Sequence, residues 1–245
     1  MIVRCGLLKK SDVFETQDAF FDHWVNIHGP IAAEMDYLRE YKQNLVIDKV
    51  NERFPSGKID IDGFSELHFD NYGEMLAGVK SLNGETGNAL LDDAEYFSQK
   101  RLCDVVVFFR KVVREVPAYL WNTDLIHMVS FISRPDDMTP ARFEREWCDV
   151  HAKLVEAIPG FIGYNQNVVL DRYVDGLSAT PEQLPCDGMA DLYFEDQAAL
   201  DCFNDSWERE MVKSGRGSAL IGAIDTYFVK SATIVSGADL GGYPL

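Results

Sequence analysis

Residues 20–30 read FFDHWVNIHGP, a helical pattern that ends in a histidine, a glycine and a proline. A second stretch, FEREWCDVHAK at 143–153, repeats the aromatic, tryptophan and histidine positions 123 residues later. Around these stretches the two halves of the chain align without a gap over about forty residues. The aligned part includes a Y-x-Q-N string at 41–44 and again at 164–167. The chain therefore contains two copies of one structural plan.

Each copy alternates between two kinds of hydrophobic pattern. Short apolar runs predict buried strands, and stretches that follow a Thr, Asn or Asp cap predict helices. A first helix is expected after Thr16 and after Thr139, and a second at 71–82 and at 196–203. The predicted strands are 2–8, 41–47, 63–69 and 103–109 in the first copy, and 125–132, 164–170, 188–194 and 231–236 in the second.

The resulting order is that of the ferredoxin-like βαββαβ unit, an antiparallel sheet with its helices on one face. The other face of each predicted sheet is also largely apolar, so it must be covered, and the second copy is the obvious cover. We expect an α+β protein in which two such repeats enclose a shared interior. The predicted boundaries are 1–115 for the first domain, 116–124 for a linker and 125–245 for the second domain.

The chain of 245 residues is acidic, with 40 Asp and Glu against 23 Lys and Arg and a formal net charge of -17. This charge repels polyphosphates and anionic lipids, so we expect neither nucleic acid nor a membrane as partner. The N-terminus does not resemble a signal peptide and no apolar run is long enough to span a bilayer, which favours a cytoplasmic protein. The five cysteines form no CxxC pair, and phosphate-loop, HExxH and GxSxG motifs are absent from the sequence. We therefore predict no metal site and no nucleotide cofactor.

Three strings in each copy are informative: FFDHWVNIHGPIA, LREYKQN and FSELHFD in the first, and FEREWCDVHAKLV, IPGFIGYNQN and MADLYFED in the second. In these strings the chain resembles the EthD family of the dimeric α+β barrel superfamily, over nearly all of both halves. The resemblance implies an intrachain dimeric α+β barrel with a cavity between sheet and helices in each half. It also implies a wide range of chemistry, because the superfamily includes lactone isomerases, cyclases, decarboxylases, dehydratases, cofactor-free oxygenases and heme proteins.

The second copy departs from the family string at one point. Ala152 and Lys153 stand where the first copy has Gly29 and Pro30. Without the proline, the helix that bears His151 is expected to run on and to point its imidazole differently. If only one half is active, this difference favours the first.

A histidine lies on the apolar stripe of the first helix in each copy. The stripe comprises Phe20, Trp24, Ile27, His28 and Ile31, and again Phe143, Trp147, Val150, His151 and Leu154. Each histidine is thus expected to face inward. It is either a general acid or base beside a cavity, or an interior histidine that holds helix to loop.

Acidic side chains recur in the middle of the third strands. Alternation places Phe64, Glu66 and His68 on the face away from the helices, where a barrel interior would be. Asp191 and Tyr193 have the same place in the second copy. A buried carboxylate costs several kcal/mol unless it is paired or hydrated, so the recurrence needs a physical reason.

Two explanations fit these carboxylates. One is an ion pair, for which Arg4, or His127 at the equivalent place in the second copy, could supply the partner. The other is an acid/base role in a cavity, with Glu66 as the best single candidate. The Tyr and Gln of the Y-x-Q-N strings could orient a substrate oxygen or make matching structural hydrogen bonds.

These residues suggest a cofactor-independent lyase or isomerase acting on a small hydrophobic oxygenated compound, such as a lactone, a phenolic or a polyketide fragment. The catalytic candidates are Glu66, His28, His68, Asp191 and His151, and the substrate-binding candidates are Tyr41, Gln43, Arg4, Trp24, Phe64, Tyr164, Gln166, Tyr193 and His127. The alternative is a non-catalytic binding protein for a hydrophobic ligand or for heme, with an inward histidine as axial ligand. A third possibility is an assembly module with one purely structural half. The expected partner is a small molecule, and a homo-oligomer is possible.

Overall fold

The computed structural model describes residues 1–50, 54–121, 123–214 and 217–236. The predicted linker falls between the fourth and fifth strands, and the last residues of the predicted second domain, 237–245, lie outside the described residues. No described helix is both long and apolar enough to cross a bilayer. In chain order the elements are β1 (Ile2–Leu8), α1 (Gln17–His23), η1 (Trp24–His28), α2 (Gly29–Ala32), β2 (Glu40–Val50), β3 (Gly63–Phe69), α3 (Tyr72–Ser81), α4 (Gly84–Phe97), β4 (Asp104–Arg114), η2 (Ala118–Leu120), β5 (Ile126–Ser133), α5 (Pro140–Arg145), η3 (Glu146–His151), α6 (Ala152–Glu156), β6 (Phe161–Val174), β7 (Leu177–Ser178), β8 (Gly188–Phe194), α7 (Gln197–Ser214), α8 (Gly217–Leu220) and β9 (Ala223–Val235).

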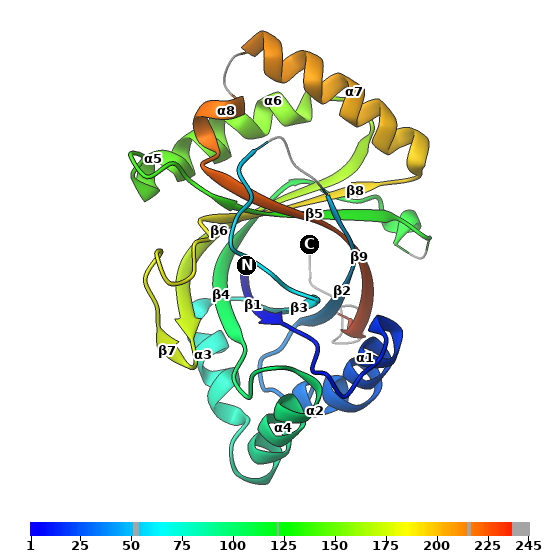
Figure 1. Cartoon of the computed structure of the whole chain (residues 1–245), viewed down its shortest axis with the longest axis vertical. Helices are drawn as coiled ribbons and strands as arrows, with labels where there is room; N and C mark the ends of the chain where they lie inside the picture. The colour runs from blue at the N-terminus through cyan, green and yellow to red at the C-terminus, as the bar shows by residue number, and fades with distance from the viewer. Residues whose placement is uncertain (51–53, 122, 215–216, 237–245) are drawn as a thin grey trace.

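Four strands of each half form a curved sheet, and the two sheets close into a barrel (Figure 1). In the described chain the strand order is β4-β1-β3-β2 in the first half and β9-β5-β8-β6 in the second, with β7 paired to the end of β6. Antiparallel pairing of β2 with β9 and of β4 with β6 joins the sheets at both seams. Figure 1 shows α1–α4 on one side of the barrel and α5–α8 on the other. The predicted α+β protein with a shared interior is confirmed as an antiparallel barrel of eight strands.

Side chains fill the barrel interior. Along β3, which is buried throughout, Phe64 packs with the apolar cluster inside the barrel, whereas Leu67 and Phe69 pack with the cluster under the helices. The predicted facing of this strand is therefore confirmed. The interior cluster also includes Val3, Phe108, Phe131, Met189 and Tyr227, together with Ile59, Ile61, Leu184 and Cys186 from two loops.

A glycine at the start of each third strand lets a tryptophan pack on the sheet. A Cβ on Gly63 would lie 2.8 Å from Cζ3 of Trp24, and a Cβ on Gly188 would meet Trp147 more closely still. Both indoles are fully buried. The recurring glycine and the recurring tryptophan are thus two sides of one contact, because any side chain at the glycine would displace the ring.

The helix that carries each predicted histidine contains a π-helical turn, η1 or η3. The carbonyl of Trp24 accepts the backbone N–H of Gly29, five residues on, and the side-chain amide of Gln43 at 3.0 Å. The wider turn rotates Ile27 away from the sheet, so its side chain is 50% exposed, and Val150 is exposed in the same way. The predicted inward stripe is therefore wrong at these two positions.

Pro30 does not end the helix in the first half. It follows the π-helical turn η1 without a break in the helix, and the chain stays helical to Ala32. In the second half α6 continues to Glu156. The prediction that only the second helix runs on is wrong, since both continue past their histidines.

Several elements differ from the prediction, and three of the differences are large. β9 begins at Ala223 rather than at 231, because the polar side chains at its start are satisfied: the Asp225 carboxylate accepts the backbone N–H of Ile59 at 2.9 Å. The helix α7 extends to Ser214 rather than to 203. The helix α4 was not predicted, since its glycine-containing start resembles a loop, and Gly84 indeed has φ of 65°. This helix forms one wall of a cavity in the first half.

Candidate functional site

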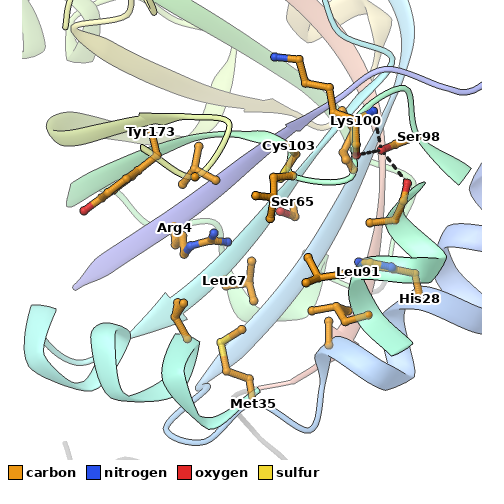
Figure 2. Close-up of a pocket in the computed structure, with 18 of the residues that line it drawn as sticks. Arg4, His28, Met35, Ser65, Leu67, Leu91, Ser98, Lys100, Cys103 and Tyr173 are labelled. Atoms are coloured by element: carbon orange, nitrogen blue, oxygen red, sulfur yellow. Dashed lines mark hydrogen bonds between the residues drawn. The ribbon is translucent and has the colours of Figure 1, made fainter. Parts of the chain in front are cut away.

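A cavity of about 380 Å³ lies between the outer face of the first sheet and the helices α2, α3 and α4 (Figure 2). Its size is typical of sites that bind small molecules. The second half contributes Tyr173 and Gly176 at the β6–β7 turn. Most of the lining is apolar, including Met35, Leu67, Met75, Leu90, Phe97, Val105 and Val107.

A histidine and an aspartate form a pair at this cavity. His28 lines the cavity from η1, and its Nδ1 lies 3.0 Å from Oδ2 of Asp93 on α4. The other oxygen of Asp93 lies 2.8 Å from Nε2 of His23. Among the described residues, Nε2 of His28 has no hydrogen-bond partner, and the ring packs on Phe97 with 4.6 Å between centroids.

The charge on Asp93 sets the tautomer of His28. Burial raises the pKa of the Asp93 carboxyl, but the hydrogen bonds from His28 and His23 outweigh burial and hold that pKa below its usual value. An ionised carboxylate can only accept, so Nδ1 of His28 carries the proton. In the neutral imidazole Nε2 is then a free acceptor, which is the form that a general base requires.

A buried tyrosine also lines the cavity. The hydroxyl oxygen of Tyr41 accepts the side-chain amide of Gln43 at 2.8 Å, and Tyr41 lines the cavity. Burial raises the pKa of Tyr41, so the phenol stays protonated and can donate its own proton. Gln43 is fully buried and does not line the cavity. Its side-chain amide donates to the hydroxyl oxygen of Tyr41 and to the carbonyl oxygen of Trp24. The same hydrogen bonds recur in the second half among Gln166, Tyr164 and Trp147.

The corresponding space in the second half is filled. Met128 occupies the place of Arg4, because each pairs with the leucine of its third strand, and Phe228 occupies the place of Val107. Both of these apolar side chains pack against the core under the helices of that half. His151 lines a separate pocket with residues of α5, η3 and α8, and no carboxylate of the described chain is hydrogen-bonded to it.

Burial lowers the pKa of His151 to about 4, which predicts a pH-dependent stability. Because this value lies below the unfolded value of about 6.5, the unfolded state takes up the proton first as the pH falls. The free energy of unfolding should fall between pH 6.5 and 4 by up to roughly 3 kcal/mol through this group, and be unaffected by it above that range. Urea unfolding of wild type and His151→Gln at pH 7 and pH 4 measures the effect. The variant should lose less stability on acidification, and an equal loss in both proteins would contradict the prediction.

The predicted acidic residues lie inside the barrel, around one arginine. Arg110 Nη2 lies 2.5 Å from Oε2 of Glu66 and 3.0 Å from Oδ2 of Asp191, so one guanidinium pairs with a carboxylate from each half. The Nε of Arg110 donates to Oδ1 of Asn167 at 2.7 Å, and Asn44 donates to Oε1 of Glu66 at 3.0 Å. All these side chains are buried. We call this group the Arg110 cluster.

Two histidines flank the Arg110 cluster. His68 Nε2 lies 3.2 Å from Glu66, and His127 Nε2 lies 3.3 Å from Asp191. Burial would raise the pKa of Glu66, but the Arg110 charge and the contact with His68 hold it well below its usual range. Burial lowers the pKa of His68. The cluster therefore has the properties of a buried ion pair, the first of the two explanations for the carboxylates.

The structure separates ten of the predicted residues into two groups. Phe64, Glu66, His68, His127, Asp191 and Tyr193 face the barrel interior, whereas Arg4, Trp24, His28 and Tyr41 line the first cavity. Glu66 and His28 therefore lie on opposite sides of the sheet and cannot share one substrate. The predicted equivalence of Arg4 and His127 is also wrong. His127 pairs with Tyr193 as Val3 pairs with His68, so the offset in the first strands is 124 residues.

Sequence reasoning missed two residues. Asp93 lies in the acidic run LDDAEYF, where nothing distinguishes it from a solvated side chain, and it meets His28 only through the unpredicted α4. Arg110, in contrast, could have been identified from the pattern of its strand. It follows Val106 and Phe108 at alternate positions of one strand, which places it on the inward face where Glu66 needed a cation.

Comparison with known proteins identifies the family of the chain. The EthD domain matches residues 15–100 and 135–214, one segment in each half. The chain belongs to the EthD family. No match by sequence is found among curated proteins.

Two solved structures support the fold of this EthD chain. An anthrone oxidase-like protein has 12% sequence identity and a TM-score of 0.59 over 95% of this chain and 92% of its own. A putative monooxygenase of Lactobacillus acidophilus has 7% identity and a TM-score of 0.56 over 96% of each chain. An EthD family protein of Bacillus halodurans has 21% identity and a TM-score of 0.32, covering 44% of this chain and 96% of its own.

Proposed function

We propose that the first half is a cofactor-independent lyase or isomerase, with His28 as the group that moves the proton. The observation that carries the proposal is the Asp93–His28 pair, whose free imidazole nitrogen lies at an apolar cavity of small-molecule size. A small hydrophobic compound with a carbonyl or phenolic oxygen suits such a lining.

The chemistry follows from the groups that line the cavity. Nε2 of His28 takes a proton from a carbon next to the substrate carbonyl, and Asp93 stabilises the imidazolium that forms. The Tyr41 hydroxyl donates a hydrogen bond to the oxygen on which negative charge develops. The imidazolium then returns the proton, either to another carbon in an isomerisation or to a leaving oxygen in an elimination.

The two halves have different roles in this proposal. We infer that the chain is a tandem of two ferredoxin-like EthD repeats, since both halves have the same strand order and the same tryptophan, histidine and Y-x-Q-N positions. The second repeat completes the barrel, and its own cavity is filled. The Arg110 cluster is structural, and Glu66 and Asp191 are not catalytic.

A cavity-blocking variant tests the proposal. Wild-type protein in D2O with lactones, aromatic ketones and phenols should exchange substrate C–H for C–D, detected by proton NMR, and the active compounds should raise its melting temperature. Val107→Phe, which copies the second half, should lose both effects because its ring fills the cavity. Phe228→Val in the second half is the matched control and should keep both. Exchange that survives in Val107→Phe would place the activity elsewhere.

Binding without catalysis is the second candidate, and the same imidazole favours it. Heme would be held by Nε2 of His28, with Asp93 fixing the imidazole ring, and Arg4 could pair with a propionate. Bound heme would supply redox chemistry. A Soret band that appears on heme titration and is lost in His28→Ala, without any C–D exchange in the same protein, would favour this candidate over the lyase or isomerase.

A further inference from the structure

One cation of the first cavity has no protein partner. Arg4 projects from the middle of β1 into the cavity, as Figure 2 shows. It is flanked on the sheet by Leu67 and Val107, and no described residue hydrogen-bonds to its guanidinium or forms an ion pair with it. A guanidinium has five donors, and those of the half-buried Arg4 are left to solvent or to a molecule that enters the cavity.

The other cations of the cavity are already paired. Lys100 lies 2.7 Å from Asp104, and Arg101 lies 2.9 Å from Asp92. In a chain with 40 acidic residues, acceptors are abundant, yet none of the described ones is placed at Arg4. The positive charge is thus left for something that enters the cavity.

Comparison of the halves links this arginine to the cavity. The second half has Met128 at the same position of its sheet, between Leu192 and Phe228, where the space is filled. The half with the open cavity therefore has the arginine, and the half without it has an apolar residue of similar length. A purely structural requirement of the repeat would not need the charge.

We propose that Arg4 recognises a carboxylate, and that the cavity takes a small hydrophobic carboxylic acid. This inference rests on the proposed function and names its substrate class. The planar guanidinium suits a carboxylate, to which it can donate two parallel hydrogen bonds. The apolar body of the acid would pack on Leu67, Met75 and Leu90 and present its reactive carbon toward His28.

Acid and amide pairs on one apolar frame test the inference. The probes are 2-naphthoate with 2-naphthamide, and cyclohexanecarboxylate with its amide. Binding of each probe is measured from the shift in melting temperature and from the quenching of tryptophan fluorescence. Wild type should bind at least one acid about 10-fold or more tighter than its amide. Arg4→Met, which copies Met128, should remove that preference by weakening the acid and not the amide. Lys100→Met is the matched control and should keep the preference.

The outcomes separate this inference from the proposed function. If no acid is preferred over its amide by wild type, or if Arg4→Met keeps the preference, the inference is wrong even where neutral compounds undergo exchange. If the preference is present and no compound undergoes exchange, carboxylate recognition stands and the catalytic proposal fails. Arg4→Lys guards against a folding defect, because it keeps the charge and loses the paired geometry. It should show a reduced preference with a wild-type melting temperature.

Discussion

Replacing Arg110 by methionine is expected to lower the free energy of unfolding by about 3–5 kcal/mol. The guanidinium is buried in the barrel and pairs with Glu66 at 2.5 Å and with Asp191 at 3.0 Å. Methionine can fill much of the volume but cannot compensate the two carboxylates, and a carboxylate buried without a partner is costly whether it stays ionised or takes up a proton. Urea unfolding at pH 7, followed by tryptophan fluorescence, measures the loss.

Two further variants show whether charge is the cause. Adding Glu66→Gln and Asp191→Asn to the Arg110 variant removes the uncompensated charges, so most of the lost stability should return. Arg142→Met breaks an exposed ion pair with Glu146 on one helix turn, and it should cost less than about 1 kcal/mol. If the triple variant is no more stable than Arg110→Met alone, packing rather than charge would explain the loss.

The second large effect is expected at the Asp93–His28 pair. His28→Asn should lower kcat/KM by 10²–10⁴-fold, on the order of a lost general base. Asp93→Asn should lower it by on the order of 10²-fold, because an amide can donate to Nδ1 and so move the imidazole proton onto Nε2. The measurement is turnover of whichever compound the exchange screen identifies, with binding followed separately by melting temperature.

The control for this pair lies on the same carboxylate. His23 also contacts Asp93, at 2.8 Å, but does not line the cavity. His23→Asn should therefore keep kcat/KM within about tenfold of wild type, since the tautomer of His28 is set by its own contact with Asp93. A His28→Asn variant that binds and turns over substrate like wild type would rule out the proposed mechanism.

The sequence predicted those parts of the molecule that depend on local pattern. The alternation along β3 was sufficient to place Glu66 on the inward face and Leu67 on the helix face, since strand geometry leaves no other choice. The tryptophan and the glycine recur in both halves because the indole ring packs directly on the glycine.

The parts that depend on tertiary contacts were not accessible in this way. Periodicity placed His28 on an inward stripe but could not detect the π-helical turn, because that turn depends on a hydrogen bond from Gln43 to the carbonyl of Trp24. The partner of His28 is 65 residues away on α4, whose pattern is that of an exposed helix. The cavity itself depends on which side chains are small, such as Val107, and on which are large at the matching place, such as Phe228.

The turn between β6 and β7 belongs to the second half of the chain, yet Tyr173 and Gly176 form part of the wall of the first cavity. The boundary between the repeats is therefore not the boundary of the site. A molecule held in the cavity would touch both repeats at the seam where β4 meets β6, and its binding free energy would also oppose their separation. Ligand binding at this site and association of the two repeats are therefore thermodynamically linked. The second repeat remains necessary to the first although its own cavity is filled.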